Sequence, residues 1–109
     1  MYKIYVTDYF KKKLKKLVKK DNKLKARLIV ALSEFDKRIS VDIGAGVFKL
    51  RLARENGGKS SGYRLYILIV EVHNLLTPIS IYEKSSKDSL RYEELVADLL
   101  GVRKELELL

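Results

Sequence analysis

Residues 63 to 70 constrain the fold more than any other part of the chain. They read Tyr-Arg-Leu-Tyr-Ile-Leu-Ile-Val, a run of mainly aromatic, aliphatic and β-branched side chains without glycine or proline. A short run of this kind, bounded by turn residues, is typical of a β-strand. Two further strands are predicted on either side of it in the sequence, at residues 47–52 and 75–84. We therefore predict a small antiparallel sheet made of successive hairpins.

Two amphipathic helices are predicted before this sheet, after a first strand at residues 2–6. Thr7 can cap the first helix, and Asp21 and Asn22 separate it from the second. Apolar side chains recur at helical spacing in both segments. These positions are Phe10, Leu14, Leu17 and Val18 in the first helix, and Leu24, Leu28, Ala31, Leu32 and Phe35 in the second. The two helices are predicted to form a hairpin.

A loop, a turn and a last helix complete the order. Residues 40–46 contain two glycines and are predicted to be a loop, and residues 71–74 are predicted to be a turn. Asp88 or Ser89 can cap the last helix, in which Gly101 costs about 1 kcal/mol relative to alanine. The predicted fold class is α+β with the order β-α-α-β-β-β-α, in which the sheet packs on the helical hairpin and is followed by a C-terminal helix.

Length and composition limit the possible classes of function. The chain has 109 residues, 47% of them hydrophobic, which predicts one domain over residues 1–109. No stretch approaches the roughly 20 apolar residues of a membrane span, and the start does not look like a signal peptide, so we expect a cytoplasmic protein without a membrane partner. The absence of cysteine excludes disulfides and thiolate sites. His73 has no second histidine, so no metal and no cofactor are assigned.

Positive charge is concentrated in the first quarter of the chain. Residues 1–27 carry eleven Lys or Arg and two Asp, and the other 82 residues are balanced. A polyanion would meet this part of the chain, and nucleic acid is the first partner to consider. The lysine-rich first helix can also be simply a solvated helix face, and both interpretations stay open.

The sequence Gly-Gly-Lys-Ser at residues 57–60 suggests a phosphate-binding P-loop. A P-loop needs a glycine five residues before its Gly-Lys pair and a helix after the loop. Ala53 occupies the glycine position, and a predicted strand follows the segment. We therefore interpret this segment as a glycine-rich, basic turn between two strands.

Polar and cationic side chains are predicted to share one face of the sheet. Strand alternation places residues 48, 50 and 52 on the helix side, together with Ile79 and Ile81. Pro78 predicts an edge or a bulge at the start of its strand, and a bulge would change this facing. The opposite face then gathers Lys49, Arg51, Arg64, Tyr66, Ser80, Tyr82 and Lys84, with Lys59 in the loop at its end.

This set of side chains suits metal-free cleavage of RNA by attack of the neighbouring 2′-hydroxyl. Arg51 and Arg64 could stabilise the negative charge of the phosphorane, because the planar guanidinium matches two phosphate oxygens. A lysine or Tyr82 can protonate the leaving group. The general base stays open between Tyr82 and a lysine, whose pKa would have to fall from ~10.4 to near 7, a difference of about 4 to 5 kcal/mol.

The segments VFKLRLARENGGKSSGYRLYILIV and LLTPISIYEKSSKDSL resemble the toxins of the RelE/ParE superfamily, in particular the HigB-like toxins. The shared pattern consists of Lys49-Leu50-Arg51, Gly58-Lys59-Ser60, Tyr63-Arg64, Tyr82 and Lys84, with Leu90 after it. The resemblance implies a RelE-like fold and a toxin of a type II toxin-antitoxin system that cuts messenger RNA on the ribosome. It also implies a cognate antitoxin protein as a partner, and ribosomal RNA as a contact of the basic first helix.

The resemblance also implies roles for individual residues. Ser61 and Glu83 depart from the pattern, since a glycine and a small residue are usual there. In a regular strand, Glu83 would lie on the sheet face opposite the site. A ParE-like toxin that acts on DNA gyrase, and a non-catalytic module that binds RNA or the ribosome, remain alternatives. The implied catalytic residues are Lys59, Arg64, Tyr82 and Lys84, and the implied supporting or RNA-binding residues are Lys49, Arg51, Arg54, Ser60 and Tyr66.

Overall fold

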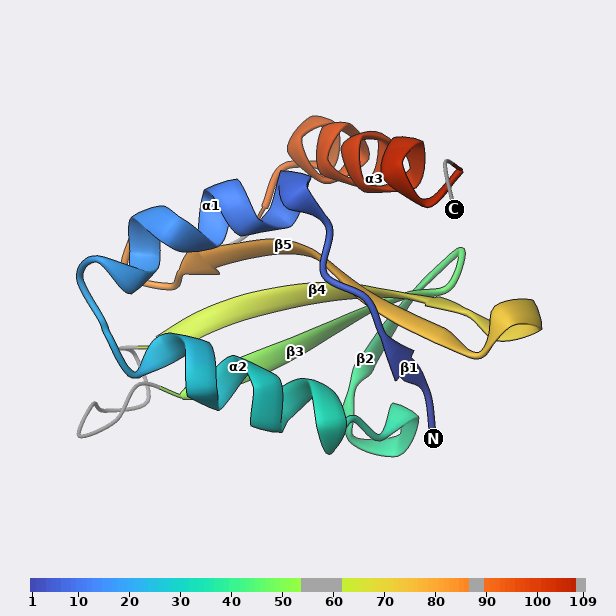
Figure 1. Cartoon of the computed structure of the whole chain (residues 1–109), viewed down its shortest axis with the longest axis horizontal. Helices are drawn as coiled ribbons and strands as arrows, with labels where there is room; N and C mark the ends of the chain where they lie inside the picture. The colour runs from blue at the N-terminus through green and yellow to red at the C-terminus, as the bar shows by residue number, and fades with distance from the viewer. Residues whose placement is uncertain (54–61, 87–89, 108–109) are drawn as a thin grey trace.

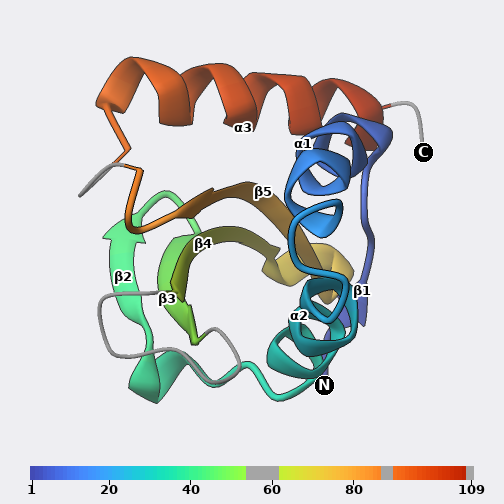
Figure 2. The same cartoon turned by 90° about the vertical axis from the view of Figure 1, so that its left-hand side faces the viewer.

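The computed structural model describes residues 1–53, 62–86 and 90–107, and it confirms the α+β class. Its strands form one five-stranded sheet in the order β1-β5-β4-β3-β2. Helices α1 and α2 cover one face of this curved sheet, and α3 lies across its other side (Figures 1 and 2). The elements in chain order are β1 (Lys3–Ile4), α1 (Asp8–Val18), α2 (Leu24–Ser33), a 3₁₀ turn (Lys37–Ile39), β2 (Val41–Gly44), β3 (Val47–Ala53), β4 (Gly62–Val70), a 3₁₀ turn (Glu71–His73), β5 (Leu75–Glu83) and α3 (Tyr92–Leu106).

Two features of the sheet differ from the sequence prediction. Residues 41–44, predicted as part of a loop, form strand β2, which pairs antiparallel with β3. The two glycines of the predicted loop instead make the β2–β3 turn, where Gly44 and Gly46 have φ values of 95° and 80°. The sheet is also not purely antiparallel, because β1 pairs with β5 in parallel.

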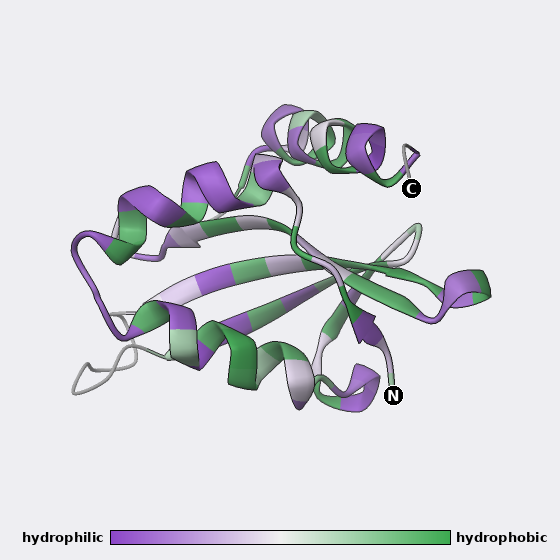
Figure 3. Ribbon diagram, viewed as in Figure 1, coloured by the Kyte–Doolittle hydropathy of each residue, from purple (hydrophilic) through white to green (hydrophobic). Residues whose placement is uncertain are grey.

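Apolar side chains form two cores, one on each face of the sheet. Figure 3 colours the ribbon by hydropathy and shows green, hydrophobic bands along α2, β3 and β4. The first core lies under α1 and α2 and includes Phe10, Leu28 and Leu65. The second core lies between the sheet and α3 and includes Val102 and Ile79. The sheet face that carries the predicted cationic side chains is therefore partly covered by α3.

Strand β5 contains the bulge that Pro78 predicted. Two adjacent residues of β4 pair with Pro78 and Ser80, so Ile79 is an extra residue in β5. Ile79 consequently packs in the core under α3, and its predicted position on the helix-hairpin side was wrong. The alternation is regular again after the bulge, since Ile81 lies in the core under α1 and α2 and Tyr82 in the core under α3.

One predicted helix cap is confirmed and another is wrong. The side chain of Thr7 accepts a hydrogen bond from the backbone N–H of Phe10, as predicted for the first helix. The N-cap of α3 is Arg91, and not residue 88 or 89, which lie outside the described residues. Glu94 supports this start because its carboxylate accepts a hydrogen bond from the backbone N–H of Arg91 at 3.3 Å.

Polar contacts attach α3 to α1 and β5. The carboxylate of Asp98, which is only 4% exposed, accepts hydrogen bonds from the Tyr9 hydroxyl at 2.8 Å, the Lys13 ammonium at 2.5 Å and the Ser80 hydroxyl at 2.7 Å. Glu105 accepts hydrogen bonds from the backbone N–H groups of residues 8 and 9, at 2.8 and 2.7 Å. These N–H groups have no partner within α1, so α3 caps the start of α1.

Glycine has a low helix propensity, but we expect packing to require Gly101 at its position in α3. A Cβ atom there would lie 2.4 Å from Cε2 of Tyr9, whose hydroxyl is held by Asp98. We expect Gly101→Ala to lower the free energy of unfolding by about 1 to 3 kcal/mol, measured by urea denaturation. In a Tyr9→Leu background the same substitution should be neutral or stabilising. Equal stabilisation in both backgrounds would contradict this packing.

Candidate functional site

Two rows of polar side chains, called the cationic rows below, cross the sheet on the face that α3 partly covers. In the first row, Arg51 of β3 lies opposite Arg64 of β4, which lies opposite Tyr82 of β5. In the second row, Lys49 lies opposite Tyr66, and Tyr66 lies opposite Ser80. This arrangement confirms the predicted facing of these six side chains. Directly opposed residues have Cβ atoms about 4.5 to 5.5 Å apart, so each row is continuous.

The pairing of Arg51 with Arg64 sets two cationic residues directly opposite each other on neighbouring strands. Opposed like charges destabilise a sheet. Within the described ranges, neither arginine forms an ion pair with a carboxylate, so protein groups there do not compensate the repulsion. A phosphate bound between the two guanidinium groups would relieve it, because each group can donate two hydrogen bonds to phosphate oxygens.

Tyr66 and Tyr82 form the support of these rows. The two side chains are 4% and 6% exposed, and their rings stack with centroids 6.3 Å apart. The ammonium of Lys49 lies 5.7 Å from the centroid of the Tyr66 ring, within the range of a cation–π interaction. Both tyrosines belong to the core under α3, so their rings serve packing rather than base stacking. Tyr66 thus helps to place Lys49.

The hydroxyl of Tyr82 keeps its proton at neutral pH. Burial raises the pKa of Tyr82 to about 12, and the neighbouring Tyr66 hydroxyl adds to this effect, whereas Arg64 and the backbone of Leu90 lower the pKa. A group of this kind can donate a hydrogen bond or a proton, but it is not a general base near pH 7. The alternative that Tyr82 is the base is therefore disfavoured.

Of the remaining predicted site residues, Lys84 is within the described part of the chain. The backbone N–H of Lys84 donates to the carbonyl of Gly62 at 2.9 Å, so Lys84 follows β5 beside the start of β4. The structure thus brings Lys84 to the end of the sheet that carries Arg51 and Arg64. Arg54, Lys59 and Ser60 lie outside the described residues, and their predicted roles stay predictions.

Glu83, the carboxylate that departs from the family pattern, lies away from the cationic rows. It pairs with Tyr63, whose side chain belongs to the core under α1 and α2. Its carboxylate is 3.9 Å from the ammonium of Lys20. The sequence prediction that Glu83 faces the opposite side of the sheet is confirmed.

Two exposed side chains at the start of α3 were not among the predicted site residues. Arg91 and Tyr92 follow Leu90, whose backbone lies close enough to Tyr82 to affect its pKa. Both side chains are largely exposed, and the guanidinium of Arg91 also contacts Glu94 at 3.2 Å. A helix that starts at residue 88 or 89 would contain both residues in its first turn, so the sequence did not predict them at the helix start. The spacing of Arg91 and Glu94 was the available signal, because a glutamate three residues after a cap is common at a helix start.

Within residues 1–53, 62–86 and 90–107, His, Asp and Glu side chains form no group of three that could hold a metal ion. In the same ranges, no helix is long and apolar enough to cross a membrane.

The family follows from comparison with known proteins. Residues 2–103 match the model of a family described as the RelE toxin of the RelE/RelB toxin-antitoxin system. The chain belongs to the RelE toxin family. A comparison with curated protein sequences gives no match. RelE proteins form toxin-antitoxin systems, so this chain is a toxin of such a system.

A solved structure supports the fold independently. The chain is similar to the free state of the E. coli toxin RelE, in a mutant with two arginines replaced by alanine, with a TM-score of 0.57 and 21% sequence identity. The similarity covers 88% of this chain and 95% of that chain. The RelE-like fold predicted from the sequence is confirmed by this likeness.

The raised pKa of Tyr82 has a measurable effect on stability. A folded-state pKa of about 12, above the ordinary 10.0, stabilises the fold fully below about pH 10. This contribution is lost as the pH rises from 10 to 12, because the unfolded chain loses the proton first. Relative to Tyr82→Phe, we expect the wild-type protein to lose about 2 to 3 kcal/mol over this window, measured by urea denaturation. The ring of Tyr92 is exposed, so in Tyr92→Phe the free energy of unfolding should depend on pH as it does in the wild-type protein. If this pH dependence were the same in all three proteins, the raised pKa of Tyr82 would be contradicted.

Proposed function

We propose that this chain is a HigB-like, ribosome-dependent endoribonuclease that cleaves messenger RNA and so inhibits translation. The observation that carries the proposal is the opposed pair Arg51 and Arg64, with the protonated hydroxyl of Tyr82 next in the same row. Membership in the RelE toxin family supports it. Because the ribosome is the site of action, we also propose a cytoplasmic location.

The reaction we propose begins with attack of a 2′-hydroxyl on the adjacent phosphodiester. The new bond joins the 2′-oxygen to phosphorus, and the bond from phosphorus to the 5′-oxygen breaks. The products are a 2′,3′-cyclic phosphate and a 5′-hydroxyl. Arg51 and Arg64 stabilise the extra negative charge of the phosphorane. Tyr82, or Lys59 or Lys84 at the loop end, donates the proton that the leaving 5′-oxygen requires.

The described residues of the cationic rows supply no general base at neutral pH, and this supports the proposal that cleavage depends on the ribosome. Among the described residues of the rows, lysine and arginine are ordinarily protonated at neutral pH, and Tyr82 keeps its proton. The nearest carboxylate along β5, that of Glu83, faces the other side of the sheet. We propose that a group of the ribosome, or a water molecule that it positions, accepts the 2′-hydroxyl proton. Free RNA should therefore be a poor substrate.

A cognate antitoxin is the second partner in this proposal. Unrestrained cleavage of messengers would stop growth, so the cationic rows must be blocked when the toxin is held inactive. An acidic antitoxin segment could cover these rows or displace α3, on which Tyr66 and Tyr82 pack. Ribosomal RNA is the proposed contact of exposed lysines on α1.

The experiment compares Arg64→Ala with the wild-type protein on translating ribosomes that carry a defined messenger. We expect the substitution to reduce cleavage, mapped by primer extension, by about 10²-fold or more, because a donor to the developing negative charge is lost. Arg103→Ala, which removes an exposed arginine at the far end of α3, is the matched control and should cleave normally.

Three results would contradict the proposal. If Arg64→Ala cleaves the messenger as the wild-type protein does, the arginine pair has no role in the reaction. An intact messenger from a protein that still stops growth would favour a ParE-like action on DNA gyrase. Salt-dependent RNA binding without product or toxicity would favour a non-catalytic RNA-binding module.

A further inference from the structure

A pocket of about 260 Å³ opens beside Arg51, where strand β3 becomes an edge of the sheet. Strand β2 pairs with β3 only as far as Lys49, so in the described part of the chain no strand lies beside the following residues on that side. Leu50 and Arg51 alternate between the two faces of the strand, yet both line the pocket because it lies at this edge. The pocket therefore adjoins the end of the cationic row that begins with Arg51.

The walls of this pocket are largely apolar. Ala31, Phe35 and Leu50 are partly buried against the core under α1 and α2. The ring of Phe35 packs edge-on against the ring of Phe48, with centroids 5.4 Å apart, so its position is fixed. Ile39, which ends the 3₁₀ turn after α2, is 83% exposed although it is aliphatic. Pockets for drug-sized ligands have volumes of about 300 to 1,000 Å³, so this smaller pocket suits one flat ring system.

One carboxylate in the lining of the pocket is available to a ligand. Glu34 is exposed, and within the described ranges its carboxylate forms no ion pair and no hydrogen bond. Asp36 also lines the pocket, but its carboxylate accepts hydrogen bonds from the backbone and the guanidinium of Arg38 at 2.7 to 3.2 Å. Glu34 therefore supplies the acceptor that a bound molecule can use.

Arginines lie on both sides of this carboxylate. Arg51 lines the pocket itself, and Arg27 lines a neighbouring hollow of about 360 Å³, to which Ala31 and Glu34 also belong. Across residues 1–53, 62–86 and 90–107, neither arginine forms an ion pair with a carboxylate. Two available guanidinium groups around one acceptor complement a nucleotide chain, whose phosphates are anionic and whose base edges carry N–H donors.

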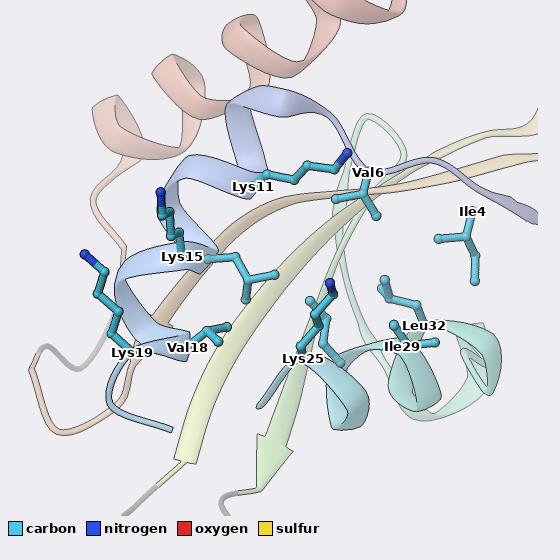
Figure 4. A pocket seen from close by; sticks show the side chains of 11 residues that line it. Ile4, Val6, Lys11, Lys15, Val18, Lys19, Lys25, Ile29 and Leu32 are labelled. Atoms are coloured by element: carbon cyan, nitrogen blue, oxygen red, sulfur yellow. The ribbon is translucent and has the colours of Figure 1, made fainter. Parts of the chain in front are cut away.

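A larger hollow, of about 480 Å³, lies between α1 and α2 and has a different composition. Figure 4 shows that aliphatic side chains such as Ile29 and Leu32 and lysines such as Lys15 line it. Among the described residues, no carboxylate and no member of the cationic rows belongs to its lining. Only the pocket beside Arg51 thus combines a flat apolar space, an acceptor and a residue of the candidate site.

Guanine is the base that best matches a single available carboxylate. Its Watson–Crick edge carries two adjacent donors, N1–H and the N2 amino group, which can form parallel hydrogen bonds to the two carboxylate oxygens. Adenine and cytosine offer one amino group beside an acceptor nitrogen, and the N3–H of uracil lies between two carbonyl acceptors. These acceptors would face the carboxylate and weaken binding. Proteins commonly read single-stranded RNA in this way, with the unstacked base beside an aromatic ring.

We propose that the pocket between α2, the 3₁₀ turn Lys37–Ile39 and β3 binds the base of a guanine nucleotide of the messenger, next to the phosphate that Arg51 holds. Glu34 accepts hydrogen bonds from the Watson–Crick edge, and Phe35 and Ile39 contact the ring. This subsite rests on the proposed nuclease function, because its ligand is a nucleotide that flanks the scissile phosphate. Glu34 is then a specificity-determining residue, and cleavage depends on the sequence at the cut.

The test replaces guanosine by inosine, which lacks only the N2 amino group. Defined messengers on translating ribosomes carry a single inosine at each position that flanks the cut, and cleavage is mapped by primer extension. At one of these positions, inosine should reduce cleavage by the wild-type protein at least about fivefold. Glu34→Ala should cleave the two messengers within about twofold of each other. Glu107→Ala, which removes an exposed carboxylate at the end of α3, should keep the wild-type preference.

A second pair of variants separates recognition of the base edge from apolar contact. Ile39→Ala should slow cleavage of both messengers by the same factor, about twofold to threefold, because an aliphatic wall does not distinguish guanine from hypoxanthine. Val72→Ala is the matched control, because Val72 is 87% exposed in the other 3₁₀ turn and does not line the pocket. It should cleave both messengers as the wild-type protein does. Circular dichroism and thermal melting confirm that the variants are folded.

A binding measurement without ribosomes distinguishes failure of this inference from failure of the nuclease proposal. The probes are fluorescent 2′-O-methyl tetranucleotides with one guanosine or one inosine, which cannot be cleaved because the attacking hydroxyl is blocked. Fluorescence anisotropy should show a preference for guanosine that Glu34→Ala removes. If this preference is found but no messenger is cleaved, only the nuclease proposal is refuted.

Three results would overturn the guanine subsite. They are cuts without guanosine on either side, cleavage that is indifferent to inosine at both flanking positions, and a preference for guanosine that persists in Glu34→Ala. Each of these results would leave the nuclease proposal intact. If the protein neither cleaves messengers nor prefers guanosine in binding, both proposals are wrong.

Discussion

The carboxylate of Asp98 is buried where α1, α3 and β5 meet, and the positions of these elements depend on it. A buried charge is costly unless its hydrogen bonds are satisfied. Here Tyr9, Lys13 and Ser80 supply donors from α1 and β5. Ser80 lies directly opposite Tyr66, which supports Lys49. The same carboxylate therefore fixes the C-terminal helix and one end of a row of the candidate site.

The two faces of the sheet combine packing and charge in different ways. The face under α1 and α2 is apolar along β3 and β4. The opposite face is shared between α3 and the cationic rows, so the buried rings of Tyr66 and Tyr82 connect the core to the charged side chains. Opposed arginines are destabilising in a free sheet. Their presence is physically reasonable if binding of a phosphate compensates the repulsion.

The sequence was sufficient to predict the parts of this architecture that depend on local patterns. Strand alternation placed Lys49, Arg51, Arg64 and Tyr66 on one face, and the Thr7 cap followed from its side-chain chemistry. Strand β2 was missed because four residues carry little pattern, and they form a strand only by pairing with β3 across a turn of left-handed residues. These elements depend on tertiary contacts that a local pattern does not contain.

The errors in the candidate site have the same origin. The bulge at Pro78 was anticipated, but its effect on Ile79 depends on the register with β4. The role of Asp98 was not predicted from the sequence, because its three hydrogen-bond donors come from distant parts of the chain. Helix α3 covers part of the cationic face, where it buries Tyr82 and so raises the pKa of Tyr82. The spacing of residues in the sequence could not predict this contact either. Long-range contacts thus decide the protonation state of a candidate catalytic group.

The most direct test of the account is the chemistry of the RNA ends produced on the ribosome. Products from a defined messenger can be treated with a kinase and with a phosphatase that opens cyclic phosphates, and then analysed by mass spectrometry. Attack by the 2′-hydroxyl on a phosphate held by Arg51 and Arg64 should give a 2′,3′-cyclic phosphate or its 3′-phosphate, together with a 5′-hydroxyl. A 3′-hydroxyl with a 5′-phosphate would require attack by water from the other side of the phosphate, and would contradict the central claim.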